Sequence, residues 1–165
     1  MTRNYFIELA EYNFWANTIV HSWFEKINDE QWKQPVVSSF DSLEKTSLHI
    51  LSAERVWLDR LKKSEAPVWL QDSFKGSKKE ILNEWEKTSQ GLKSFVENFD
   101  ESGMQINLSF KRLNGEAYDM PHYQVFAHVF NHGSYHRGQI VTMLRQVGFE
   151  AVSSTDLLGF FRNKN

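Results

Sequence analysis

Apolar side chains recur every three or four residues along four stretches of the chain, a spacing that places them on one face of an α-helix. The stretches cover residues 2–26, 41–63, 77–99 and 121–146. In the first, the apolar face consists of Phe6, Leu9, Ala10, Phe14, Ile19, Val20, Trp23 and Phe24. The pattern therefore predicts four long amphipathic helices.

Capping residues indicate where three of these helices begin. Asp41 is followed three residues later by Glu44, and Ser77 is followed by Glu80. Both pairs have the form of a capping box, in which the two side chains satisfy free backbone N–H groups of the first turn. Pro121 suits the first turn of the fourth helix, because its missing N–H would have no intrahelical partner there.

The segment between the third and fourth helices has a different period. Ile106, Leu108 and Phe110 alternate with polar residues, and Asn114-Gly115 is a strong hairpin signal. We therefore expect a two-stranded excursion within residues 104–120. The stretch NDEQWKQPVVSSF, residues 28–40, contains a proline and a serine pair and is expected to be a loop.

These elements predict an all-α fold, a four-helix bundle with a short β-hairpin between helices three and four and a short C-terminal helix. That last helix is expected from about Thr155, with Leu157, Leu158 and Phe161 packed on the bundle. A chain of 165 residues fits a single domain, 1–165. The long connections permit helices that are not consecutive to be neighbours, and they leave helix order and handedness open.

Composition narrows the functional classes. A net charge of −2 with interspersed charges gives no basic face for nucleic acid, and no apolar run approaches the roughly 18 residues of a membrane span. The first residues do not read as a signal peptide, and we expect a cytoplasmic protein. There are no cysteines, so any thiol chemistry must use a thiol from outside the chain.

Three of the six histidines stand four residues apart, at His128, His132 and His136. A four-residue step rotates about 40° around a helix, so neighbours in this row can share one ion, whereas His128 and His136 diverge by about 80°. A divalent ion held by nitrogen needs a third protein ligand. His49 is the best candidate, because it shares a helix face with Ile50, Ala53, Val56 and Trp57.

Each histidine also has a simpler interpretation. A lone histidine on an apolar face is often a hydrogen-bonded core residue, and exposed helix histidines recur at this spacing by chance. His21 and His122 have no partner at helical spacing. The pair His132 and His136 together with an inward-facing His49 is what favours a metal site over these alternatives.

The chain resembles the DinB/YfiT-like family of metal-dependent enzymes, which is distinct from the DNA polymerase of similar name. The similarity lies in EYNFWAN, in SSFDSLEKTSLHILSAERVWLDRL and, most specifically, in VFNHGSYHRGQIVTMLRQVG. The resemblance implies that His49, His132 and His136 bind the metal, with zinc or nickel expected. His128 is then left over, beside the ligands or in the core. Relatives are often dimeric, so a homodimer is also expected.

Three histidines without a fourth protein ligand leave a coordination position open, as in catalytic sites. A thiol or a water molecule at that position becomes a nucleophile at neutral pH. We therefore expect an enzyme that transfers a low-molecular-weight thiol to a small electrophilic substrate. The alternatives are a metal-dependent small-molecule hydrolase and a non-catalytic dimeric metal-binding module. The catalytic acid or base is not predicted, and no organic cofactor is.

Polar residues near the histidines are expected to be structural. Glu54 lies about 140° around the helix from His49 and is expected to face away from the ion. Arg137 and Gln139 are expected to serve helix packing, with binding of an anionic or polar substrate as the alternative.

Small and aromatic residues near the histidines carry two further expectations. Gly133 and Gly138 are expected to allow close helix approach. The aromatic residues Tyr5, Tyr12 and Trp15 are expected either to wall the pocket or to lie in the core.

Overall fold

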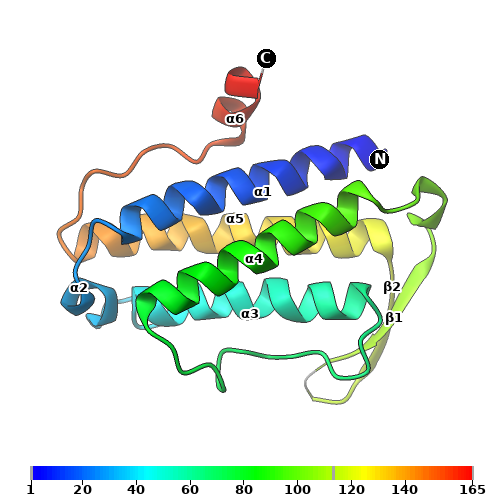
Figure 1. Cartoon of the computed structure of the whole chain (residues 1–165), viewed down its shortest axis with the longest axis horizontal. Helices are drawn as coiled ribbons and strands as arrows, with labels where there is room; N and C mark the ends of the chain where they lie inside the picture. The colour runs from blue at the N-terminus through cyan, green and yellow to red at the C-terminus, as the bar shows by residue number, and fades with distance from the viewer. Residues whose placement is uncertain (1, 113, 165) are drawn as a thin grey trace.

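The computed structural model describes residues 2–112 and 114–164. Its long helices are α1 (Arg3–Phe24), α3 (Leu43–Leu61), α4 (Lys78–Glu97) and α5 (His122–Gln146). The shorter elements are α2 (Asp29–Lys33), the 3-10 turn η1 (Glu101–Gly103), strands β1 (Asn107–Lys111) and β2 (Ala117–Pro121), and α6 (Leu157–Lys164). The predicted four-helix bundle with a hairpin and a C-terminal helix is confirmed (Figure 1).

The bundle places α1 diagonally opposite α3, and α4 diagonally opposite α5. Helix α1 packs against α4 and α5, and α3 packs against the same two helices. Figure 1 shows that α3 and α4 run in the same direction, so that the connection formed by residues 62–77 returns along the length of the bundle. Helix α5 runs opposite to α3, which brings the first half of α3 beside the second half of α5.

The hairpin lies at the end of the bundle where α3 ends and α5 begins (Figure 1). Its strands are antiparallel, with Leu108 opposite Met120 and Phe110 opposite Tyr118. Gly115 has φ 88°, in the left-handed region that glycine adopts without strain, as the Asn-Gly signal predicts. Leu108 is buried, whereas Phe110 and Met120 are partly covered and face the helices.

Helix starts agree with the sequence only in part. The Ser77 and Glu80 capping box is confirmed. The start of α3 is different: Ser42 caps it by accepting from Lys45 N–H, while Asp41 pairs with the Lys45 side chain. The prediction of Asp41 as the N-cap is therefore wrong, and the N-cap is the next residue, Ser42.

Two smaller corrections concern the segments that precede α3 and α5. Pro121 precedes the first turn of α5 as its N-cap, and it also ends β2. The loop predicted over residues 28–40 contains α2, which is held by its own capping box between Asn28 and Gln31.

A buried polar layer separates two apolar clusters along the bundle axis. One cluster contains Trp23, Trp32 and Trp85, and the other contains Phe6 and Phe126. On each of the four long helices, a polar residue stands between the positions that belong to one cluster and those that belong to the other. These polar residues form one hydrogen-bonded group, which comprises Asn13, Asn17, Glu54, Ser89 and Arg137. All five are buried, and among the described residues Glu54 and Arg137 are the only buried acidic and basic side chains apart from histidines.

The buried layer is closed by bridging amides. Asn13 and Asn17 each donate to Glu54 Oε1, at 2.8 and 3.0 Å, and accept from Arg137 Nη1, at 2.6 and 2.9 Å. Two asparagines therefore link a buried carboxylate to a buried guanidinium. Glu54 faces α1 and α4 rather than His49, as the helical rotation predicts.

Gly133 belongs to the same layer. A Cβ there would lie 2.9 Å from Arg137 Nη1 and from Asn13 Oδ1, so the glycine makes room for the guanidinium. Gly138 has no neighbour within 4 Å of such a Cβ, and the expectation of close helix approach at that position is wrong.

Helix α6 docks through Phe160, which is buried against Tyr12 and Trp15 of α1. Leu157 and Phe161 also pack there, but Leu158 is 66% exposed, contrary to the expectation. Tyr12 is buried in the core, Trp15 packs against α6 and Tyr5 is exposed, so these rings do not form the pocket wall that was one alternative considered from the sequence.

None of the helices in the described residues combines the length and apolarity required to cross a bilayer.

His21 is expected to make the fold sensitive to acid. Its ring lies edge-on to Trp85 at 4.8 Å, Nε2 has no partner among the described residues, and burial lowers its pKa to about 4. Unfolded histidine has a pKa near 6.5, so the unfolded state takes up this proton first as the pH falls. Neutral His21 therefore contributes its full stabilisation above about pH 6.5 and loses it as the pH falls toward 4. The loss in the free energy of unfolding reaches about 2 kcal/mol at pH 5.

This loss can be measured by urea unfolding of chelated protein at neutral and acidic pH. His21→Leu is expected to lose less stability on acidification than the native chain. Equal losses in the two proteins would contradict the prediction.

Candidate metal centre

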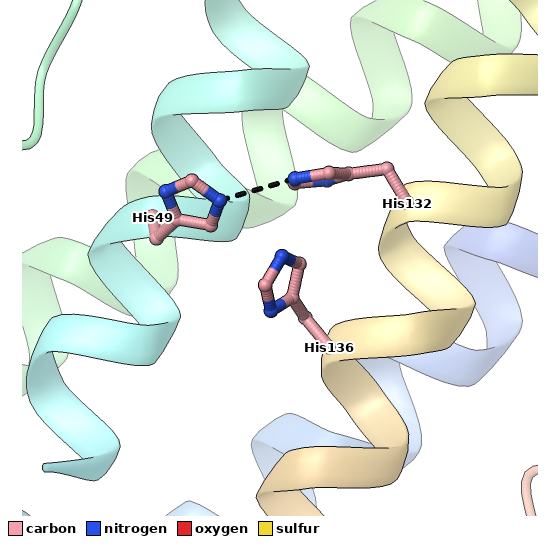
Figure 2. Close-up of side chains that lie close together, drawn as sticks. All are labelled: His49, His132 and His136. Atoms are coloured by element: carbon pink, nitrogen blue, oxygen red, sulfur yellow. Dashed lines mark hydrogen bonds between the residues drawn. The ribbon is translucent and has the colours of Figure 1, made fainter. Parts of the chain in front are cut away.

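Three histidine side chains converge between α3 and α5. His49 lies in the second turn of α3, and His132 and His136 lie one turn apart on α5 (Figure 2). The Nε2 atoms of His49 and His132 are 3.1 Å apart, and one ring nitrogen from each of the three residues lies within 4.8 Å of the others. The structure thus brings together the three residues that spacing and family resemblance had selected.

Two glutamine side chains orient two of these rings. Gln71 Oε1, from the connection between α3 and α4, accepts from His49 Nδ1–H at 2.8 Å. Gln139 Oε1 accepts from His136 Nδ1–H at 2.7 Å, while its amide donates to Ser39 Oγ. With Nδ1 protonated, the lone pair of each ring is on Nε2, which is the tautomer that a metal ligand needs.

Burial keeps these imidazoles neutral. Burial, together with the neighbouring His136, His49 and His128, lowers the pKa of His132 to about 3. Burial also lowers the pKa of His49 and of His136, against the opposing effect of the two glutamine contacts. Three uncharged nitrogen donors are therefore directed at one point at neutral pH.

This donor set fits a divalent transition metal ion. Metal–nitrogen bonds of about 2.0–2.1 Å in a tetrahedral site separate the nitrogens by about 3.3 Å, close to the 3.1 Å between His49 and His132. Imidazole nitrogen suits zinc, nickel, copper and iron, so the donors do not distinguish among these ions.

His128 lies outside the three-histidine cluster. It is exposed, stacks edge-on against Trp57 at 5.4 Å and lines the neighbouring pocket. The core position considered from the sequence is therefore wrong, and the ring lies beside the cluster, 5.9 Å from that of His132.

A pocket of about 560 Å³ opens beside the histidines. It lies between α3, α5 and the hairpin, and His49 and His132 form one end of it. Its walls are largely apolar and aromatic, with contributions from Ala53, Val56, Trp57, Trp69, Phe110, Tyr118 and Met120. Such walls and a polar end group are typical of a small-molecule site.

Several residues around the histidines were not predicted from the sequence. Phe40 packs against His49 at 4.2 Å and against His136 at 5.8 Å, and Trp69 packs edge-on against His49. Phe40, Trp69 and Gln71 all come from connections, where no periodic pattern shows which way a side chain points. Gln139 was noted from the sequence for helix packing or substrate binding, but not for its contact with His136.

The fold and the histidine cluster define a helical bundle with three histidines that could hold a metal ion at the end of a pocket. Comparison with known proteins identifies the family. The model of the DinB family matches residues 1–163, so the chain belongs to the DinB family. Protein DinB of Bacillus subtilis strain 168 is 26% identical over 162 residues, covering 95% of this chain and 94% of the relative.

Solved structures share the fold at lower identity. A DinB-like protein from Bacillus cereus ATCC 10987 has a TM-score of 0.66 at 19% identity, with 84% of this chain and 89% of that chain covered. A DinB-like protein from Bacillus subtilis, YjoA, has a TM-score of 0.67 at 13% identity, with 90% and 97% covered. These similarities support the same bundle architecture.

Proposed function

We propose that His49, His132 and His136 bind one divalent ion, zinc or nickel, and that the site transfers a low-molecular-weight thiol to a small electrophile. The observation that carries the proposal is the convergence of three neutral imidazoles at the end of an apolar pocket. A divalent ion bound there supplies the positive charge that deprotonates a thiol at neutral pH.

The protein's own groups supply orientation and exclusion of water. Gln71 and Gln139 hold His49 and His136 with Nε2 directed at the centre. Trp69 packs edge-on against His49 and, with the other apolar residues, walls the pocket, where a polarisable sulfur makes favourable contacts with an aromatic ring. These walls support a thiol over water as the nucleophile.

The reaction balances without a further reagent. The thiol proton passes to solvent, the sulfur forms a bond to the electrophilic carbon, and the leaving group departs with the bonding electron pair. Homodimerisation and a cytoplasmic location remain predictions from the sequence.

A fluorogenic alkyl chloride such as monochlorobimane, offered with a small thiol to zinc- or nickel-loaded protein, tests this proposal. We expect metal-dependent release of chloride and a thioether product. Chelation or His132→Ala is expected to lower kcat/KM at least about 100-fold, about 2.7 kcal/mol of transition-state stabilisation.

Two outcomes would count against thiol transfer. A rate unaffected by both treatments would refute it, and turnover of esters or amides without any thiol would support hydrolysis instead.

A further inference from the structure

The pocket beside the histidines has an unusual charge balance. Its lining includes two arginines, Arg60 and Arg112, and no aspartate or glutamate among the described residues. Arg112 pairs with Glu116 outside the lining, at 3.3 Å. Arg60 makes no ion pair within the part of the chain that the structure describes.

Arg60 is held in place but incompletely satisfied. Its guanidinium carbon lies 4.7 Å from the centre of the Trp57 ring and 4.9 Å from that of Phe110, and Nη2 donates to the Lys111 carbonyl at 2.7 Å. Its Nε is buried without a partner among the described residues, and burial lowers its pKa. A guanidinium offers five N–H donors, so this cation retains capacity for an anion.

Arg60 lies on the same face of α3 as His49. The two are eleven residues apart, which corresponds to a rotation of only about 20° and a rise of about 16 Å. Ala53, Val56 and Trp57 line the pocket between them. Because the arginine side chain leans toward the N-terminus, over Trp57, its charged end lies roughly 12 Å from the histidine cluster.

We propose that Arg60 binds a carboxylate at the far end of the substrate, whose reacting end lies at the three histidines. The inference rests on the proposed function and specifies its substrate class: an elongated molecule with an apolar or aromatic middle and a terminal carboxylate. The group belongs either to the thiol or to the electrophile. A planar carboxylate matches the fork of a single guanidinium.

Thiols with a carboxylate at a variable distance test the proposal directly. The probes are mercaptopropionate, mercaptohexanoate and mercaptoundecanoate, each compared with the alcohol of the same length. They are titrated into cobalt-loaded protein, where sulfur binding changes the visible absorption. We expect mercaptohexanoate and mercaptoundecanoate each to bind at least about tenfold more tightly than the alcohol of the same length, and mercaptopropionate to show no such preference.

Matched variants assign the preference to Arg60. Arg60→Gln is expected to remove the advantage of the two longer acids while leaving the affinity of the alcohols unchanged, which also shows that the pocket is intact. Arg60→Lys is expected to retain part of it. Lys111→Gln removes a cation that lines an adjoining pocket, to which Arg60 also contributes, and not the pocket beside the histidines, so it is expected to change nothing.

Failure of this inference and failure of the proposed function give different results. Equal affinities of acids and alcohols at every length, with the absorption change present, would overturn the carboxylate site alone. No absorption change with any thiol would overturn thiol binding. In that case decanoate and decanamide, titrated calorimetrically, still test Arg60: a preference for decanoate that Arg60→Gln removes upholds the site, and no preference overturns it.

Two turnover comparisons locate the carboxylate. One uses mercaptohexanoate against mercaptohexanol with a neutral electrophile. The other uses a neutral thiol with chloromethylbenzoate against chloromethylbenzamide. The pair in which the Arg60→Gln variant loses its preference for the acid identifies the partner that carries the group. Loss in neither pair would overturn a role for Arg60 in substrate binding.

Discussion

Protein with His49→Ala is expected to be purified without metal, whereas the native chain retains about one ion per protein. The substitution removes the only one of the three converging side chains that comes from α3, and the two histidines left on α5 form an incomplete site. We expect the affinity for the metal ion to fall by more than roughly a hundredfold. Loss of a residue that only hydrogen-bonds to a metal ligand already lowers metal affinity about 10- to 100-fold, and loss of a ligand itself costs more.

Elemental analysis of unsupplemented protein measures this effect, and thermal unfolding provides a second measurement. Added zinc or nickel is expected to raise the Tm of the native chain but not that of the variant, since only an ion bound to the folded state stabilises it. His128→Ala is the matched control. It removes a histidine one turn from His132 that lies outside the cluster, and it is expected to retain metal. Equal metal contents in the two variants would refute the assignment.

Arg137→Met is expected to lower the free energy of unfolding by about 3–5 kcal/mol, because it leaves a buried charge without compensation. Arg137 is 1% exposed and is bridged to Glu54 by two asparagines. In the variant, the Glu54 carboxylate stays buried without a compensating positive charge. The Oδ1 atoms of Asn13 and Asn17 also lose the guanidinium N–H that donates to them. Urea unfolding at neutral pH measures the loss.

Two comparisons make this prediction specific. Arg145→Met, on the exposed face of the same helix, is expected to change stability by no more than about 0.5 kcal/mol. The double variant Glu54→Gln with Arg137→Met is expected to be less destabilised than the sum of the single changes, because it removes both buried charges together. Native-like stability of Arg137→Met would show that the layer carries no uncompensated charge.

The sequence predicted the helices and the histidines because both depend on local periodicity. The spacing of His132 and His136 directs them to one side of α5 in any helix, and the apolar neighbours of His49 direct it toward the bundle. The capping box at Ser77 is equally local, and it was predicted correctly. The short α2 had a comparable signal in Asn28 and Gln31, but the nearby proline favoured a loop.

What the sequence did not predict depends on contacts between distant segments. Asn13 of α1 and Glu54 of α3 meet across the centre of the bundle, because α1 and α3 each pack against both α4 and α5. The sequence did not predict this arrangement of the helices. Gln71 belongs to an irregular connection, so its contact with His49 follows from the path of that connection and from no repeating pattern. The arginine end of the pocket likewise requires the hairpin to fold against α3.

The connection formed by residues 62–77 affects two properties of the protein at once. It carries Gln71, which fixes the ring of His49, and Trp69, which covers the pocket. Insertions or deletions in it are therefore expected to change ion affinity and ligand preference together. The tip of the hairpin contributes Arg112 and Asn114 to the pocket, so we expect changes there to alter ligand preference and to leave the three-histidine cluster unchanged.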